Sequence, residues 1–300
     1  MIDLHMHTRF SDDGEFTPES LVEQCHQAGV QIMAITDHNC AKANEIAALE
    51  AERRNIYYVP GIEVDCSFEG VDFHILGYGI DHKSPDFIRI EQDLKAQEME
   101  TSLMRLQKTR ELGFDIHEDE LRAKAEGSHW NETWTADMFA EILLSKEEYK
   151  DHPILLPYRE GGARSVNPLL NFYWDLYSQG KPCYVQTNFP QVQDVIRIIH
   201  QNGGLAVLAH PDNNLNGREE MLDSLVSLGI DGLEAYSSYH TDQTAQTWAA
   251  AAKRHKLLIT CGSDYHGKMK PAIKLMDYGS PPDLQKMAAV FIERLEAAKN

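Results

Sequence analysis

The chain is short of basic side chains, and this shortage limits the partners it can have. Its 300 residues carry 28 Lys and Arg against 47 Asp and Glu, which gives a formal net charge of −19. A protein that binds DNA or an anionic membrane needs a basic surface, which so acidic a chain does not supply. We therefore expect no membrane partner and no stable complex with nucleic acid. If the chain binds phosphorylated molecules, another source of positive charge must attract them.

Long apolar runs, paired cysteines and two common catalytic motifs are also missing. No stretch reaches the roughly 18 apolar residues of a membrane helix, and the start Met1–His5 lacks the basic and apolar segments of a signal peptide. The 5 cysteines include no CxxC pair, a pattern typical of a reduced, cytoplasmic protein. The absence of a GxxxxGK[ST] loop and of a GxSxG turn disfavours ATP-driven chemistry and serine hydrolysis.

What the sequence does contain is an alternation of short apolar runs and helical patterns. One helical pattern begins at Thr17, which can cap the helix ahead of Pro18, and ends at Gly29. The alternation predicts an α/β fold, and about seven strands favour a barrel. The runs have the composition of buried strands in a parallel sheet and are Ile2–His7, Gln31–Thr36, Tyr57–Val64, Phe73–Tyr78, Leu205–Ala209, Gly232–Tyr236 and Leu257–Cys261.

Residues 83–181 interrupt this alternation. They begin with a long polar helical pattern, Phe87–Leu112, and continue with shorter helical patterns and no good strand. We therefore predict a barrel formed by residues 1–82 and 182–300, and a helical insertion subdomain formed by residues 83–181. The chain is expected to return to the barrel near Pro182.

Histidines and carboxylates gather at the ends of the predicted strands, where barrel enzymes place their active sites. His5 and His7 are two residues apart on the first strand, so their side chains point to the same face. Together the candidates exceed what one zinc ion needs and suit two or three divalent ions. The predicted metal ligands are His5, His7, Asp12, His38, Glu63, His74, His210, Asp264 and His266.

These motifs resemble those of the PHP (polymerase and histidinol phosphatase) family. The His-x-His-Thr start, Thr-Asp-His, Gly-Ile-Glu, Ala-His-Pro and the closing Gly-Ser-Asp-x-His occur in the family's order, over roughly residues 1–80 and 182–280. The resemblance implies a distorted (β/α)7 barrel with a helical insertion and a centre of two or three manganese, iron or zinc ions. The insertion is similar to that of the stand-alone phosphoesterases that act on nucleotides.

The resemblance also implies how the ligands are shared. His5, His7, Glu63 and Asp264 would hold one ion, Glu63 would bridge to a second ion held with His74 and His210, and Asp12, His38 and His266 would hold the third. Three ions bring about +6 and the three ligand carboxylates about −3, which supplies the missing positive charge. A metal-bound hydroxide held by Glu63, Asp264 and His210 would then attack the phosphorus atom of a small phosphomonoester, such as a nucleotide or a 3′,5′-bisphosphate nucleotide.

One part of the family pattern is absent from the insertion. Relatives usually carry an Arg-Pro-His that meets the substrate phosphate, whereas the corresponding stretch here reads Thr135-Ala136-Asp137-Met138. The neighbouring aromatic run, Phe172-Tyr173-Trp174, is interpreted as core packing. The candidate replacements for substrate binding are Arg159, Arg164, Lys181, Arg218 and His129.

Several alternatives remain open at this point. The same residues suit a histidinol-phosphate phosphatase, a phosphodiesterase or a non-catalytic regulatory module that keeps its metals. An amidohydrolase also begins with His-x-His on a metal barrel, but it usually needs a bridging Lys that we do not find. The sequence leaves the metal, the exact substrate and the oligomeric state undetermined.

Overall fold

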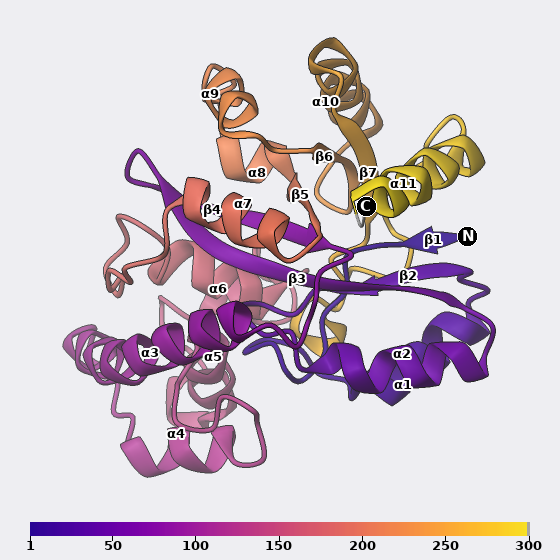
Figure 1. The fold of residues 1–300 in the computed structure, drawn as a ribbon. Helices are drawn as coiled ribbons and strands as arrows, with labels where there is room; N and C mark the ends of the chain where they lie inside the picture. Colours follow the sequence, from indigo (N-terminus) through magenta and orange to yellow (C-terminus); the bar gives the residue numbers. More distant parts are fainter. Residues whose placement is uncertain (299–300) are drawn as a thin grey trace.

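Seven strands form one sheet in the order in which they occur along the chain (Figure 1). The computed structural model describes residues 1–298. The sheet is nearly closed into a barrel, because Leu4 N, just after the first strand, donates a hydrogen bond of 3.2 Å to Cys261 O in the last. The predicted α/β barrel is therefore confirmed. The strands are β1 (Ile2–Asp3), β2 (Ile32–Ile35), β3 (Tyr57–Phe68), β4 (Val71–Tyr78), β5 (Leu205–Leu208), β6 (Gly232–Ser237) and β7 (Leu258–Gly262).

The prediction of a wholly parallel sheet is wrong at β4, which runs antiparallel to both β3 and β5. Only Glu69 and Gly70 connect β3 to β4, and their φ angles of 51° and 78° fit a tight hairpin turn. A parallel connection would need a crossover of a dozen or more residues. The reversal places His74, near the start of β4, opposite Asp65 of β3, and so brings it to the rim where the other strands end.

Helices cover the outside of the barrel between the strands (Figure 1). The first begins as predicted, with Thr17 Oγ1 accepting a hydrogen bond of 3.2 Å from Ser20 N and with Pro18 at the first helical position. The helices outside the barrel are α1 (Pro18–Gln27), α2 (Ala43–Arg53), α7 (Val192–Gln201), α8 (Pro211–Leu215), α9 (Met221–Leu228), α10 (Asp242–His255) and α11 (Leu284–Ala298). The buried face of a helix such as α7 is apolar, with Val195, Ile196 and Ile199 turned inward.

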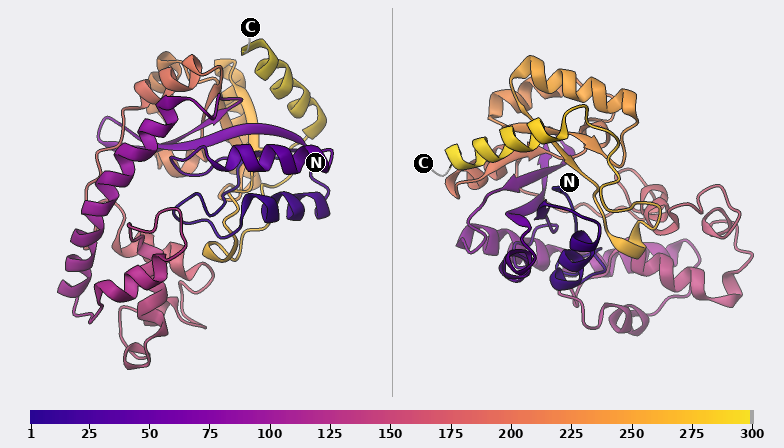
Figure 2. Two further views of the ribbon diagram at one scale, coloured as in Figure 1. Left: turned by 60° about the horizontal axis from the view of Figure 1, so that its bottom comes forward. Right: turned by 90° about the vertical axis from the view of Figure 1, so that its right-hand side faces the viewer.

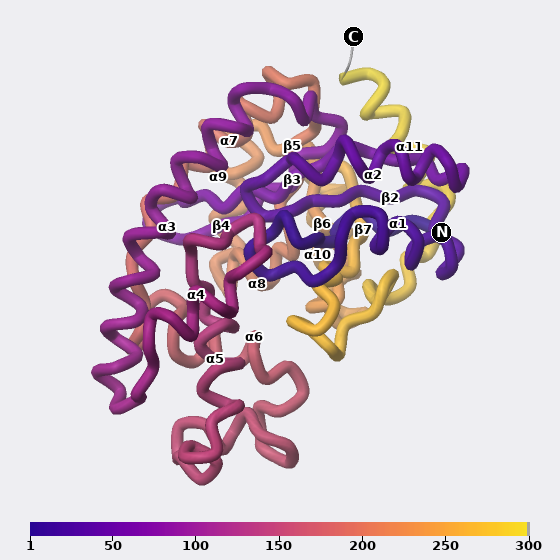
Figure 3. Tube along the Cα trace, turned by 90° about the horizontal axis from the view of Figure 1, so that it is seen from below, coloured from indigo at the N-terminus to yellow at the C-terminus, as the bar shows by residue number. Residues whose placement is uncertain are grey.

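A group of helices between β4 and α7 lies together on one side of the barrel (Figures 2 and 3). It has its own cluster of buried side chains, which includes Phe139 and Phe172. Met269, from the loop after β7, packs into the same cluster and so connects the helices to the barrel. The group consists of α3 (Pro85–Glu111), α4 (Glu118–Ala125), α5 (Ala136–Ser145) and α6 (Pro168–Leu176), with short 3-10 turns at Glu147–Tyr149 and Leu156–Tyr158.

The barrel and its outer helices have two further hydrophobic clusters, a large one around β3 to β7 and a smaller one in which α1 and α2 pack against β2. Phe73 and Tyr78 of β4 are fully buried in the large cluster, and Phe291 of α11 packs against Tyr78 with ring centroids 5.3 Å apart. Among the described residues, no helix combines the length and the apolar character that a membrane crossing requires.

Candidate functional site

Imidazole and carboxylate groups from around the barrel meet at one rim. The Nε2 atoms of His5 and His7, which follow β1, lie 2.9 and 3.2 Å from Oε2 of Glu63. The same two nitrogens lie 3.2 and 3.0 Å from Oδ1 of Asp264, which follows β7. All four side chains are buried, and their donor atoms lie within 4.8 Å of one another. One metal ion can therefore contact all four.

The second oxygen of Glu63 faces a different pair of histidines. Oε1 lies 3.0 Å from Nδ1 of His74 on β4 and 3.3 Å from Nε2 of His210 after β5. These three residues form a second group of donor atoms within 4.8 Å of one another. Glu63 therefore has the geometry of a carboxylate that bridges two ion positions.

A third group contains His7, Asp13, His38 and His266, and not the predicted Asp12. Asp13 Oδ2 lies 3.0 Å from His266 Nε2, and the rings of His7 and His266 stack with centroids 3.9 Å apart. The loop folds back on itself at Gly14, where a Cβ would lie 1.9 Å from Thr8 O, and this fold brings Asp13 over His266. Asp12 lines the cavity beside this group, as Asp13 does, but does not belong to the group. The sequence did not indicate which of two adjacent aspartates faces inward.

Asp65 is a further member of the site that sequence reasoning missed. Its Oδ1 lies 3.1 Å from His38 Nδ1 and 3.4 Å from His74 Nε2. Asn39 holds the other carboxylate oxygen with a hydrogen bond of 2.7 Å and adopts a left-handed φ of 56° to do so. A signal was present in the sequence, because Glu63 and Asp65 are two residues apart on one strand and share a face.

Two charged residues outside the metal-ligand motifs support the ligands and were also missed. Glu234, buried on β6, accepts a hydrogen bond of 2.9 Å from His5 Nδ1, which turns Nε2 of the same ring toward Glu63. Lys270 is buried and its Nζ lies 2.5 Å from Asp264 Oδ2, to which Tyr239 OH also donates. Asp264 therefore has one oxygen held by protein and the other facing the histidines. A glutamate inside the apolar run of β6 was the available sequence signal for Glu234.

Buried aspartates also hold the loops that carry the ligands. Asp37 accepts hydrogen bonds of 2.5 and 2.7 Å from the backbone N and the hydroxyl of Thr8, so it fixes the loop after His7.

Asp264 itself has a φ of 55°, a left-handed conformation that is strained for any residue with a Cβ. Such strain is expected where a side chain is held in place for function.

The electrostatics of the rim fit a divalent cation. Burial raises the pKa of the Glu63 carboxyl, but His5, His38 and His74 outweigh burial and hold this pKa well below its usual value. Burial and the neighbouring His266 lower the pKa of His7 to about 4, so its imidazole is neutral at pH 7 and keeps a lone pair for a metal. In the described part of the chain, the buried atoms that make no hydrogen bond include His7 Nε2, His266 Nε2, Asp13 Oδ1 and Asp264 Oδ1. Three of these atoms do have short contacts, since His7 Nε2 lies 3.0 Å from Asp264 Oδ1 and His266 Nε2 lies 3.0 Å from Asp13 Oδ2.

A cavity of about 690 Å³ opens from this rim toward the helical insertion. His38, His74 and His210 line it on the barrel side, and Lys181 and Arg218 of the predicted substrate-binding residues line it as well. Two further cations in its wall, Arg105 on α3 and Lys270, were not predicted. Arg105 is paired with Glu98 of the same helix.

The other three residues predicted to bind substrate do not line this cavity, namely Arg159, Arg164 and His129. Arg159 donates to Leu144 O and Tyr149 O at 3.0 and 3.1 Å. Arg164 pairs with Asp175 at 2.9 Å, and His129 Nε2 lies 2.7 Å from Glu91 Oε1. Each of these polar side chains is therefore paired with another residue of the segment 83–181.

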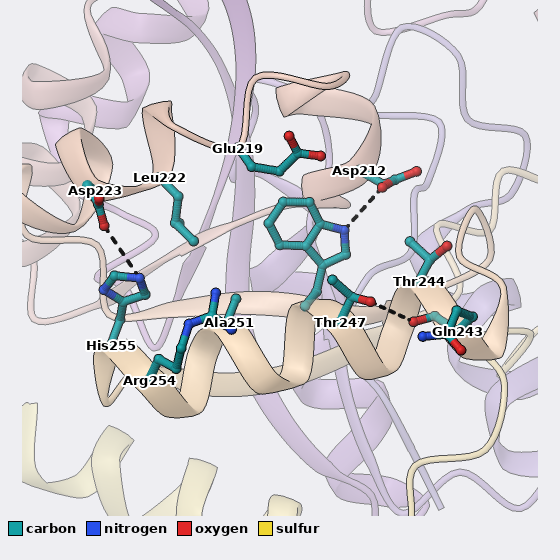
Figure 4. A pocket seen from close by; sticks show the side chains of 11 residues that line it. Asp212, Glu219, Leu222, Asp223, Gln243, Thr244, Thr247, Ala251, Arg254 and His255 are labelled. Atoms are coloured by element: carbon teal, nitrogen blue, oxygen red, sulfur yellow. Dashed lines mark hydrogen bonds and ion pairs between the residues drawn. The ribbon is translucent and has the colours of Figure 1, made fainter.

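A second cavity of about 480 Å³ lies on the outer surface between α9 and α10 (Figure 4). Trp248 is one of its lining residues and donates a hydrogen bond of 3.2 Å from Nε1 to Asp212 Oδ1. None of the predicted metal ligands lines it. The cavity at the rim is therefore the candidate functional site.

Replacing Glu63 by Gln is expected to lower the metal content of the protein by about one to two ions per chain, because one neutral amide then stands in for a carboxylate at two positions. Metal analysis after dialysis against Mn²⁺ measures this loss. Glu52→Gln, at an exposed position of α2, is the matched control. Equal metal content in Glu63→Gln and the unaltered chain would contradict a bridging role.

Curated proteins of known activity are similar to nearly the whole chain. A phosphoribosyl 1,2-cyclic phosphate 1,2-diphosphodiesterase from Eggerthella lenta is 32% identical over 268 residues, which cover 89% of this chain and 94% of the relative. A 3′,5′-nucleoside bisphosphate phosphatase from Chromobacterium violaceum is 28% identical over 300 residues, which cover 99% of this chain and 96% of the relative. Both relatives act on small phosphorylated molecules.

A solved structure and a family model also match nearly the whole chain. The structure of an amidohydrolase from Chromobacterium violaceum, determined with bound sulfate and no metal, superimposes with a TM-score of 0.77 at 26% identity and covers 99% of this chain and 96% of its own. Residues 3–292 match the family described as PHP domain. The motifs, the nearly closed seven-stranded barrel and these matches agree, and the chain belongs to the PHP domain family.

Proposed function

We propose that the chain is a metal-dependent phosphoesterase that hydrolyses a small phosphomonoester, with a nucleotide or a 3′,5′-bisphosphate nucleotide as its substrate class. The observation that carries this proposal is the position of Glu63. Its two oxygens face two histidine groups at 2.9 and 3.0 Å, and His74 and His210 of the second group line a cavity that also contains four cationic side chains. Membership of the PHP domain family supports the same chemistry.

The metal ligands follow from the three groups of donor atoms. His5, His7, Glu63 and Asp264 would hold one ion, Glu63 with His74 and His210 a second, and His7, Asp13, His38 and His266 a third. Oxygen and imidazole ligands of this kind suit manganese, iron or zinc. Divalent ions at such a site activate water as a nucleophile and neutralise negative charge on phosphoryl oxygens.

The chain's own residues prepare the site for this chemistry. Glu234 fixes the orientation of His5, and Ser11 Oγ, 3.1 Å from His7 Nδ1, fixes that of His7. Lys270 and Tyr239 occupy one oxygen of Asp264 and leave the other free to face the ligand group. Lys181 and Arg218 supply positive charge farther along the cavity wall, where a second phosphate of a bisphosphate would find partners.

Hydrolysis of a phosphodiester is the second candidate. It is favoured by the 32% identity to a cyclic phosphate diphosphodiesterase, and the same ligand groups serve either bond. A monoester and a diester differ in whether the product retains an esterified phosphate, so product analysis separates them.

The manganese-loaded protein is expected to release inorganic phosphate from mononucleotides or 3′,5′-bisphosphate nucleotides, and to lose this activity when a chelator removes the metal. A panel that also contains histidinol phosphate, sugar phosphates and cyclic ribose phosphates measures the preference. If inorganic phosphate is released only from the cyclic substrates, after their ring has been opened, the result would favour hydrolysis of a phosphodiester. No product from any phosphoester, with metal shown to be bound, would overturn the proposal.

Replacing Lys270 by Met is expected to lower kcat/KM by about 10- to 100-fold, because Asp264 then loses the cation that fixes one of its oxygens. The apolar stem is kept, so the fold should be unaffected. Lys268→Met is the control, since Lys268 lies two residues away with its side chain 57% exposed. Steady-state kinetics measures kcat/KM for both variants. Equal values would contradict the role of Lys270 in positioning Asp264.

A further inference from the structure

Two large aromatic side chains of the insertion are exposed where the sequence suggested core packing. Tyr173 and Trp174 of α6 are 40% and 43% exposed, whereas the adjacent Phe172 is fully buried. The earlier interpretation therefore holds for Phe172 alone. Exposing two adjacent aromatic rings forfeits the stabilisation that their burial would supply, so their position calls for a partner.

The exposed rings face the candidate active-site cavity. Leu170, Tyr173, Trp174 and Tyr177 all line it, and their spacing of three, four and seven residues defines one stripe of a helix. Phe172 packs into the core formed by the helices α3 to α6 and does not line the cavity, whereas Leu169 and Tyr177 contribute to both. The helix thus presents Tyr173 and Trp174 to the cavity and Phe172 to the core.

Tyr173 and Trp174 form an aromatic corner rather than two isolated rings. Their centroids are 5.1 Å apart and their planes meet at 65°. The cavity that they line also contains His38, His74 and His210 of the metal-ligand groups. At about 690 Å³ it is much larger than a phosphate group and has room for a nucleotide.

We propose that Tyr173 and Trp174 form a stacking platform for the base of a nucleotide whose phosphate lies at the metal-ligand groups. This inference rests on the proposed phosphoesterase function and narrows it, because a base-free ribose phosphate has nothing to stack on the platform. An aromatic face binds any base, since every base has a π surface. The platform therefore selects nucleotides over sugar phosphates.

The polar groups near the platform indicate weak selection among bases. Ser178 Oγ donates a hydrogen bond of 2.7 Å to Trp174 O, and Gln179 Nε2 donates one of 3.2 Å to Gly70 O. Tyr184 OH donates to Gln186 at 3.1 Å. These groups are used by the protein itself, so base edges meet few free partners there. Purine and pyrimidine nucleotides should consequently bind with similar affinity.

Equilibrium binding of phosphonate analogues, which cannot be hydrolysed, to the manganese-loaded protein tests the platform without any turnover. Calorimetry with the phosphonate analogues of AMP, UMP and ribose 5-phosphate is expected to show both nucleotides binding about 10-fold more tightly than the sugar phosphate, which corresponds to ~1.4 kcal/mol. In the double variant Tyr173→Ala and Trp174→Ala, nucleotide affinity should fall to that of ribose 5-phosphate. The affinity for ribose 5-phosphate should be unchanged.

Two further variants keep this test decisive. Tyr173→Phe with Trp174→Phe retains the aromatic faces and should keep nucleotide affinity within about twofold. Tyr57→Ala removes a similarly exposed ring, 42% exposed, that does not line the cavity, and should change nothing. Equal binding of nucleotides and ribose 5-phosphate by the unaltered chain would overturn the platform. Base preference without hydrolysis of any phosphoester would instead overturn the proposed function and leave the platform standing.

Discussion

The site depends on one buried carboxylate that faces two sets of imidazoles at once. Glu63 is fully buried, with Oε2 2.9 Å from His5 and Oε1 3.0 Å from His74. Groups packed this closely in a dry interior need a shared positive charge, because unpaired buried carboxylates are costly. Two features of the fold bring the partners of this carboxylate into place. The reversed strand β4 brings His74 to Glu63, and the contact between the ends of β1 and β7 places His5 beside Asp264.

The same constraint resolves the conflict between an acidic chain and a phosphorylated substrate. A net charge of −19 repels phosphate at long range, and the cationic side chains in the cavity are few. Under the proposed function, divalent ions supply the positive charge at the rim, while Lys181 and Arg218 add to it along the wall. The aromatic pair Tyr173 and Trp174 needs no charge to attract a base. The phosphate groups of the substrate are then recognised by the metal ions and the cationic side chains, and its base by the aromatic surface.

Much of the fold was predictable from the sequence, because apolar runs and helix caps are local signals. The direction of β4 was predictable too, had the two-residue connection Glu69–Gly70 been recognised as a hairpin. Side-chain direction within a loop is set by tertiary contacts, which is why Asp12 was predicted where Asp13 lies. Arg105 comes to the cavity from α3, far along the chain from the ligands, and Lys270, although only six residues after Asp264, belongs to no motif that marks it as a partner of that carboxylate.

The central claim is that the two oxygens of Glu63 serve two different metal ions. A crystal structure of the manganese-loaded protein, with diffraction recorded on both sides of the manganese absorption edge, tests this directly. The account predicts separate anomalous peaks on either side of the Glu63 carboxylate, one next to His5 and His7 and one next to His74 and His210. A single peak, or manganese bound elsewhere with Glu63 contacting only protein atoms, would contradict it.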